Sequence, residues 1–217
     1  MTVSLLIDND VVIKLARMGC FTEALEAIGR TAGQAASIRA MLRYMGIADS
    51  ERRKRLCATT EEADRLRQAL TSLVEIELTQ EEAKAAAALF AVALEHGLDF
   101  DAGEAMLLVV AISRGDLDIA TGDKRALGSL PALEELAPQV SVARRRFICL
   151  EQIFLQLVNA HGWRFVGEAV ARSPRADEAI TFVRDRYGDD DGKLLGALEF
   201  LIAQQIVVAA PGWLKSI

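Results

Sequence analysis

Two short, largely apolar runs in this chain each stop at an acidic residue, and long helical segments lie between them. Residues 3–7 precede Asp8, and residues 117–121 precede Asp123. Residues 147–150 form a third run of this kind. Short runs that are apolar on both faces are typical of strands in a parallel sheet covered by helices. The pattern predicts an α/β fold whose carboxyl edge brings Asp8 and Asp123 towards one another.

Helical spacing and helix caps account for most of the remaining chain. Thr59 precedes Glu62 by three residues, and Thr79 precedes Glu82 by three, a spacing that favours the start of a helix. Glycines follow several of the helical segments and are suited to end them. The predicted helices cover residues 11–18, 21–28, 35–44, 50–70, 80–95, 101–114, 125–136 and 152–159, with a helix start after Thr59 within the fourth of these ranges.

The best boundary in the chain is His161-Gly162. Residues 1–160 hold the predicted strands and form the main domain, with a charged helical insertion at about 29–70. Residues 161–217 are predicted to be a C-terminal helical extension of about three segments. The chain length suits one large domain with a small appendage.

Composition narrows the class of protein. Apolar residues make up 52% of the 217 residues, and the three cysteines show no CxxC spacing, which argues against a disulfide framework or a zinc knuckle. No apolar stretch approaches the roughly 20 residues that span a bilayer. We therefore expect a cytoplasmic protein without a membrane partner. The net charge of −6 lacks the basic balance of most nucleic-acid binders.

Acidic residues gather at three places that an α/β fold presents to one cleft. Asp8 and Asp10 follow the first strand, Asp101 and Glu104 open a helix, and Asp123 follows the second strand. Carboxylate oxygens are the ligands that Mg²⁺ and Mn²⁺ prefer. Such a cation can activate water and stabilise charge on a phosphodiester.

Each of these acids also has a purely structural interpretation. Asp10 could cap a helix that begins at Val11, and Asp123 could cap the helix from Lys124. Asp101 and Glu104 have the spacing of a capping box, in which the glutamate accepts a backbone N–H. The sequence leaves both interpretations open for each residue.

Three of these stretches resemble the PIN-domain family. Residues 5–15, Leu-Leu-Ile-Asp-Asn-Asp-Val-Val-Ile-Lys-Leu, are similar to its opening strand and helix. Residues 101–105, Asp-Ala-Gly-Glu-Ala, resemble the D-x-G-E-A element of one branch, and residues 119–126 resemble the next strand with its metal-binding aspartate. Residues 147–150 match the final strand, so the resemblance covers about residues 1–160.

The resemblance implies a Rossmann-like α/β/α domain and an Mg²⁺- or Mn²⁺-dependent ribonuclease. Many members are VapC-like toxins of bacterial toxin–antitoxin pairs, so RNA, an antitoxin or a second copy of the chain are the implied partners. Asp8, Glu104 and Asp123 would be catalytic metal ligands, with Thr121 supporting Asp123. Asp10 stands where the family often has Asn or Ser. The family's further acid beside Asp123 is missing, so Asp101 is our first choice for a fourth ligand, and Asp118 the second.

Clustered basic residues could supply the phosphate contacts of such an enzyme. Arg52, Arg53 and Arg55 belong to one cluster, and residues 144–146 are a second run of arginines. Lys124 and Arg125 directly follow Asp123 and are further candidates for RNA binding. A solvated surface is the structural alternative for each cluster.

Two other functions fit parts of the sequence. Residues 5–12 also match the haloacid-dehalogenase pattern, in which Asp8 would be a phosphorylated nucleophile and Asp10 its acid–base partner. That pattern requires a later acidic pair, and no second acid follows Asp123 at the expected spacing. The other alternative is a non-catalytic PIN-fold interaction module that binds a protein through its C-terminal helices.

Overall fold

The computed structural model describes residues 2–45, 51, 55–187 and 190–217. Its centre is a five-stranded, all-parallel sheet in the order β3-β2-β1-β4-β5. The predicted α/β fold with a parallel sheet is confirmed. The strands are β1 (Leu5–Ile7), β2 (Ala35–Ile38), β3 (Val74–Ile76), β4 (Asp118–Thr121) and β5 (Phe147–Cys149).

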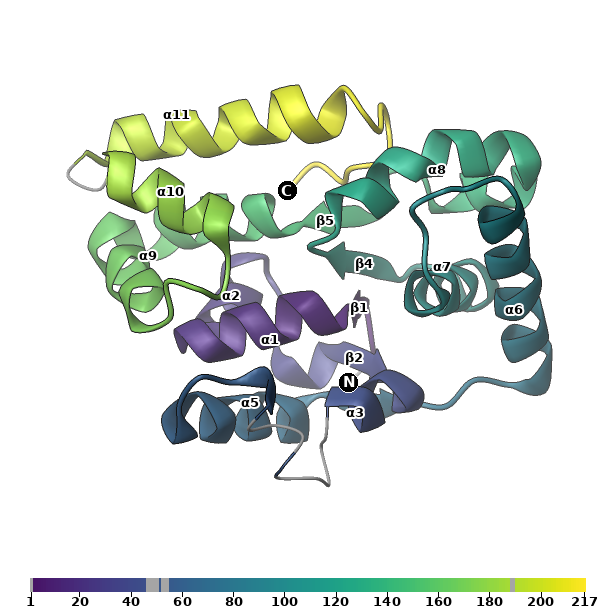
Figure 1. Cartoon of the computed structure of the whole chain (residues 1–217), viewed down its shortest axis with the longest axis horizontal. Helices are drawn as coiled ribbons and strands as arrows, with labels where there is room; N and C mark the ends of the chain where they lie inside the picture. Colours follow the sequence, from purple (N-terminus) through teal and green to yellow (C-terminus); the bar gives the residue numbers. More distant parts are fainter. Residues whose placement is uncertain (1, 46–50, 52–54, 188–189) are drawn as a thin grey trace.

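Helices cover both faces of this sheet (Figure 1). Successive residues of a strand point to opposite faces, so Leu5 and Ile7 enter one hydrophobic core and Leu6 enters the other. The first core contains side chains of α1 (Asn9–Met18), α2 (Phe21–Ala27), α5 (Thr60–Ser72) and α9 (Leu150–Arg172). The second contains side chains of α6 (Gln80–Glu95), α7 (Ala102–Arg114) and α8 (Lys124–Leu136).

The predicted helix at residues 35–44 was wrong in its first half. Residues Ala35–Ile38 form β2, and α3 (Arg39–Met45) begins only after it. Strand β3 lies in a stretch for which we predicted no strand. Both strands are short, and alanines occupy half of β2, so their own sequence gives little β signal. Pairing with β1 on one side and β3 on the other makes residues 35–38 extended.

The predicted helix starts were largely correct. Thr79 accepts the N–H of Glu82, while Glu82 accepts the N–H of Thr79, so α6 opens with a complete capping box. Thr59 accepts the N–H of Glu62 and caps α5. The first helix begins two residues earlier than we predicted, at Asn9, and its N-cap is Asp8 rather than Asp10.

The predicted boundary at His161-Gly162 coincides with a kink inside α9, where Gly162 adopts φ 76° and ψ 164°. After the kink come α10 (Glu178–Tyr187), α11 (Asp191–Leu201) and a π-helical turn at Ile202–Val207. The chain then returns to the sheet, where Leu214 bridges Phe147 of β5 and Trp213 is fully buried. The C-terminal helices therefore share both cores with the rest of the chain.

Among the residues that the structure describes, no helix combines the length and the apolar character needed to cross a bilayer.

Candidate functional site

The order of the strands creates a crevice between β1 and β4. The chain leaves β1 for β2 and β3 on one side and then returns to β4 on the other side. At such a switch point the connections diverge, and ligands of open α/β sheets bind outside the carboxyl ends of the strands. Asp8 directly follows β1, and its N–H donates to the carbonyl of Ala120 in β4 at 2.9 Å. Asp123 lies two residues beyond the end of β4.

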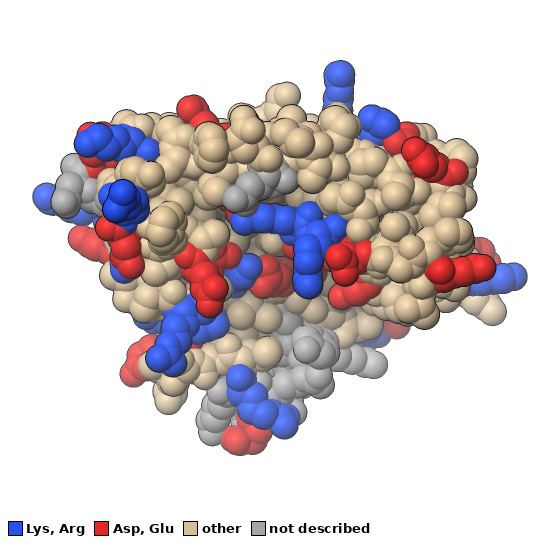
Figure 2. Space-filling model, turned by 45° about the horizontal axis from the view of Figure 1, so that its top comes forward, with Lys and Arg blue, Asp and Glu red and all other residues tan. Residues whose placement is uncertain are grey.

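A cleft of about 600 Å³ opens at this crevice. Five acids line it, and they come from three separate stretches of the chain: Asp8, Asp10, Asp101, Glu104 and Asp123. Apolar side chains form much of the remaining wall, among them Ile13 of α1, Met41 of α3 and Met106 of α7. The structure thus places every predicted acidic ligand except Asp118 in one cleft. Figure 2 shows a hollowed face with acidic side chains inside the hollow and basic side chains beside it.

Asp8 is the most buried of these acids, with 9% of its surface exposed. Its Oδ1 accepts the N–H of Asn9 at 2.7 Å and so caps α1. Burial, followed by repulsion from Asp10, raises the pKa of Asp8 to about 7. In the described part of the chain no lysine or arginine forms an ion pair with it.

Glu104 has the structural role that its spacing predicted. Its Oε2 accepts the N–H of Asp101 at 2.6 Å, and Asp101 Oδ1 accepts the N–H of Glu104 at 2.8 Å. This capping box opens α7. Burial raises the pKa of Glu104 to about 8, and the charges of Asp101, Asp123 and Asp8 add to the effect. Glu104 is therefore both a cap and a member of the acidic cluster.

Asp123 is held differently. Its Oδ1 accepts the N–H groups of Arg125 at 2.8 Å and of Ala126 at 3.2 Å, which caps α8. Burial raises the pKa of Asp123, but the hydrogen bonds from Ala126 and Arg125 outweigh it, and the pKa is lowered overall. Thr121 accepts the backbone N–H of Asp123 at 3.1 Å, so it supports the main chain at this position.

Asp10 is tied to the C-terminal helices through a lysine. Lys14 Nζ lies 2.6 Å from Asp10 Oδ2 and 3.0 Å from Asp177 Oδ2. Asp177 precedes α10 and accepts the N–H of Ile180. On the other side, Asp10 Oδ2 lies against Gly122, where an added Cβ would be closer than side chains tolerate. A glycine between Thr121 and Asp123 thus lets Asp10 approach β4.

The spacing of the acids is looser than that of a formed metal site. Among the described residues, no three His, Cys, Asp or Glu side chains are gathered tightly enough to hold one ion in this arrangement. Glu104 Oε2 and Asp101 Oδ1 face the start of α7 instead of a shared point. The cap occupies only Oε2 of Glu104, so a cation bound through Oε2 would compete with the cap.

Asp118, our second choice for a fourth ligand, lies at the wrong end of its strand. It opens β4, at the amino edge of the sheet. Its Oδ2 pairs with Arg30 Nη2 at 2.8 Å and with Lys215 Nζ at 2.6 Å.

The arginine run at residues 144–146 directly precedes β5 and therefore also lies at the amino edge of the sheet, where Arg144 lies over the ring of Trp213. Both sets are therefore structural and lie away from the cleft.

Of the residues predicted to bind RNA, Arg125 is the best placed. Its side chain is 75% exposed and lies beside Asp123, with Arg125 Nη2 and Asp123 Oδ2 3.3 Å apart.

The other residues that were predicted to bind RNA are less well placed or are not described. Lys124 pairs with the buried Glu151, with Lys124 Nζ and Glu151 Oε1 2.6 Å apart. Arg55 is exposed next to Leu56, which lines the cleft. Arg52 and Arg53 lie outside the described residues.

Sequence analysis missed three residues of this site. Lys14 stands four residues after Asp10, a helical pairing distance that could have been recognised. Asp177 is remote in sequence, and no local pattern points to it. Asn9 lines the cleft, and its Oδ1 is buried with no hydrogen-bond partner among the described residues.

Comparisons of the chain with protein-family models, curated proteins and solved structures gave no match.

Proposed function

We propose that this protein is a metal-dependent ribonuclease with a PIN-like arrangement of acids, hydrolysing RNA phosphodiester bonds with Mg²⁺ or Mn²⁺. One observation carries the proposal. Asp8 and Glu104 face the same cleft with pKa values raised to about 7 and about 8, and no described cation pairs with either carboxylate. Such uncompensated acids cost stability, and perturbed pKa values cluster at functional sites.

The donor chemistry of the cleft fits a hard divalent cation, because carboxylates dominate its polar lining. Asp8, Glu104 and Asp123 would hold the ion, with Asp101 as a fourth candidate. A bound Mg²⁺ or Mn²⁺ supplies a water of lowered pKa and neutralises charge that develops on a phosphate. It would also relieve the repulsion among the acids. The capping box at α7 uses Glu104 Oε2, so Oε1 is the oxygen of Glu104 that would bind the ion.

The protein's own side chains would position the substrate. Arg125 carries an exposed positive charge at the rim, suited to an RNA phosphate. Lys14 pairs with Asp10, so it partly neutralises one of the acids that line the cleft. The apolar wall at Ile13, Met41 and Met106 could contact a ribose or a base. A toxin–antitoxin role would follow if an antitoxin bound near this cleft.

The test uses the full chain with a labelled single-stranded RNA, in Mn²⁺, in Mg²⁺ and in EDTA. We expect cleavage that EDTA abolishes, and we expect Asp8→Asn and Asp123→Asn each to reduce it by about 100-fold or more. Asp64→Asn is the matched control, because Asp64 is an exposed acid on α5 and remote from the cleft. Normal cleavage by Asp8→Asn would contradict the proposal.

A binding measurement separates metal affinity from turnover. Mn²⁺ should raise the thermal midpoint of the parent chain, and a ligand at 100 times its Kd contributes about 2.7 kcal/mol. Asp8→Asn should lose most of that gain. A dehalogenase-like phosphatase would instead hydrolyse small phosphate esters through an acid-labile phosphate on Asp8. An interaction module would turn over neither substrate.

A further inference from the structure

Lys14 lies between the acidic cleft and the start of α10. Its Nζ is 2.6 Å from Asp10 Oδ2 and 3.0 Å from Asp177 Oδ2. Asp10 lines the cleft, whereas Asp177 directly precedes α10. Only 18% of the Lys14 side chain is exposed. The ammonium is therefore a largely buried positive charge that contacts one carboxylate from the cleft and one from the C-terminal helices.

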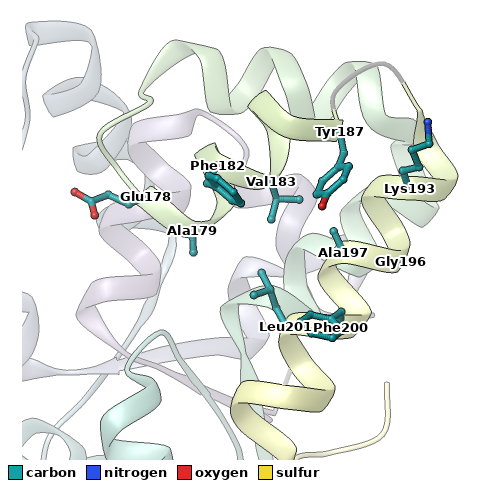
Figure 3. Close-up of a pocket in the computed structure, with 10 residues that line it drawn as sticks. All are labelled: Glu178, Ala179, Phe182, Val183, Tyr187, Lys193, Gly196, Ala197, Phe200 and Leu201. Carbon is teal, nitrogen blue, oxygen red and sulfur yellow. The ribbon is translucent and has the colours of Figure 1, made fainter.

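Asp177 is fixed in its place by the helix that follows it. Its Oδ1 accepts the backbone N–H of Ile180, which leaves Oδ2 for Lys14. Helices α10 and α11 also enclose an apolar hollow of about 760 Å³ (Figure 3), whose lining begins at Glu178. None of the described residues lines both this hollow and the acidic cleft. The hollow is therefore a separate feature, and α10 contacts the ion pair of the cleft through Asp177.

The ion pair of Lys14 with Asp10 lies directly against the chain that leads from β4 to Asp123. A Cβ added to Gly122 would overlap Asp10 Oδ2 and would be 3.6 Å from Lys14 Nζ. Gly122 separates the last residue of β4, Thr121, from Asp123. The ammonium of Lys14 thus lies at the carboxyl edge of the sheet, beside the loop that carries one of the proposed metal ligands.

The charges of the cleft suit one divalent cation better than two. Two of its five acids already have a basic partner, because Lys14 pairs with Asp10 and Arg125 pairs with Asp123. The other three acids form no ion pair with any residue that the structure places. One divalent cation offsets two of these three negative charges. A second divalent cation would leave the cleft with an excess of positive charge.

A second cation beside Asp10 would also have to displace Lys14. Enzymes with two metal ions hold them about 3.5–4 Å apart on shared or neighbouring carboxylates. The ammonium and a second ion would compete for the same carboxylate of Asp10. Like charges at such a distance repel each other strongly in a partly buried place. Asp177 holds the ammonium from the other side and so opposes its displacement.

We propose that Lys14 takes the place of a second metal ion and thereby limits the cleft to one divalent cation. Asp177 is the positioning residue that keeps Lys14 beside Asp10. Asp10 then acts on the bound ion through its charge, and the other acids of the cleft supply the ligands. This inference rests on the proposed ribonuclease function and adds to it the number of ions and the residue that sets this number.

The test is the number of Mn²⁺ ions that the full chain binds, measured by calorimetric titration. Electron paramagnetic resonance shows whether bound ions are isolated or lie as a coupled pair. We expect about one ion per chain, with the spectrum of isolated Mn²⁺. Lys14→Met removes the ammonium and keeps the apolar stem. It should raise the number to about two, with the spectrum of a coupled pair, and circular dichroism checks that it folds.

Three further variants are the controls for this result. Lys14→Arg keeps the positive charge and should bind about one ion, as the parent chain does. Lys14→Met combined with Asp10→Asn removes the carboxylate that the first change released, so the number should return to about one. Lys84→Met makes the same change at an exposed lysine of α6 and should leave the number unchanged.

Asp177→Asn provides a second route that does not depend on the folding of Lys14→Met. Its amide oxygen can still accept the N–H of Ile180, while the hold on Lys14 is weakened, so a second ion should bind here too. A coupled pair of ions in the parent chain overturns the inference and leaves the metal-dependent nuclease standing. One isolated ion in both Asp177→Asn and a folded Lys14→Met overturns it as well. A parent chain that binds no Mn²⁺ contradicts the ribonuclease proposal itself, and the inference with it.

Discussion

The acids at the two edges of the sheet differ in whether a described basic side chain pairs with them. At the amino edge, Asp118 opens β4 and receives Arg30 and Lys215 on one carboxylate oxygen. At the carboxyl edge, Asp8 follows the neighbouring strand and receives one N–H from Asn9. Asp8 is surrounded by other acids, and no described cation pairs with it. One fold thus holds one carboxylate as a structural ion pair and leaves another uncompensated.

The same difference in charge environment separates two glutamates that occupy the same position in two capping boxes. Glu82 and Glu104 each accept the N–H of their own N-cap residue. Hydrogen bonds from Arg114 are the main reason that the pKa of Glu82 falls to about 2. Burial among acids raises the pKa of Glu104 to about 8. The comparison teaches that the same local cap leaves one glutamate beside an arginine, with a lowered pKa, and the other among acids, with a raised pKa.

We expect the largest effect on stability from replacing the acid at the amino edge of the sheet, and little or no loss from the same change at the carboxyl edge. Asp118→Asn leaves Arg30 and Lys215 without a carboxylate in a partly buried place, and should lower the free energy of unfolding by about 3 kcal/mol. Asp8→Asn keeps the cap through its amide oxygen and removes a repelled charge, so stability should be unchanged or higher. Urea unfolding at pH 8 without divalent ions measures both. Equal losses would show that the edges do not differ.

Glu104 should give the next largest effect, as a pH dependence. Its pKa is about 8 in the folded protein against 4.5 as the ordinary value, so the folded state keeps a proton that the unfolded chain loses. Stability must then fall as pH rises from about 4.5 to about 8. Glu104→Gln retains the cap and should raise the free energy of unfolding by about 2 kcal/mol at pH 8, and by little at pH 4.

Glu82→Gln is the matched control for that experiment. The lowered pKa of Glu82 contributes stability above pH 4.5, which is lost as pH falls towards 2. Its substitution should therefore destabilise the protein near neutral pH. If both glutamine variants shift stability in the same direction, the electrostatic contrast between the two boxes is wrong.

The smallest effect is expected at Gly122. An alanine there forces Asp10 away from β4, because the added Cβ would overlap Asp10 Oδ2. Since that carboxylate ends a flexible side chain, we expect a stability loss below about 1 kcal/mol. Mn²⁺ affinity should drop severalfold, which calorimetric titration can measure. Gly128→Ala in α8, whose Cβ would make an ordinary 3.6 Å contact, should leave the affinity unchanged.

Much of the fold could be predicted from local patterns, but the two strands on one side of the sheet, β2 and β3, could not. The runs at β1, β4 and β5 were recognised because they are apolar and end at acids or caps. Strands β2 and β3 were missed, since residues 35–38 are extended through pairing with their neighbours. The same limit applies to the site. Its five acids were identified, whereas the bond from Lys14 to Asp177 joins residues that are far apart in sequence.

The amino-acid sequence alone determined where Glu82 and Glu104 would start their helices, because a capping box depends on hydrogen bonds between residues three positions apart. Only the tertiary structure decided that Arg114 would reach Glu82 and that Asp8 and Asp123 would surround Glu104. Charge interactions act through space, so the packing of distant segments sets the protonation of a carboxylate that its neighbours in sequence have already positioned.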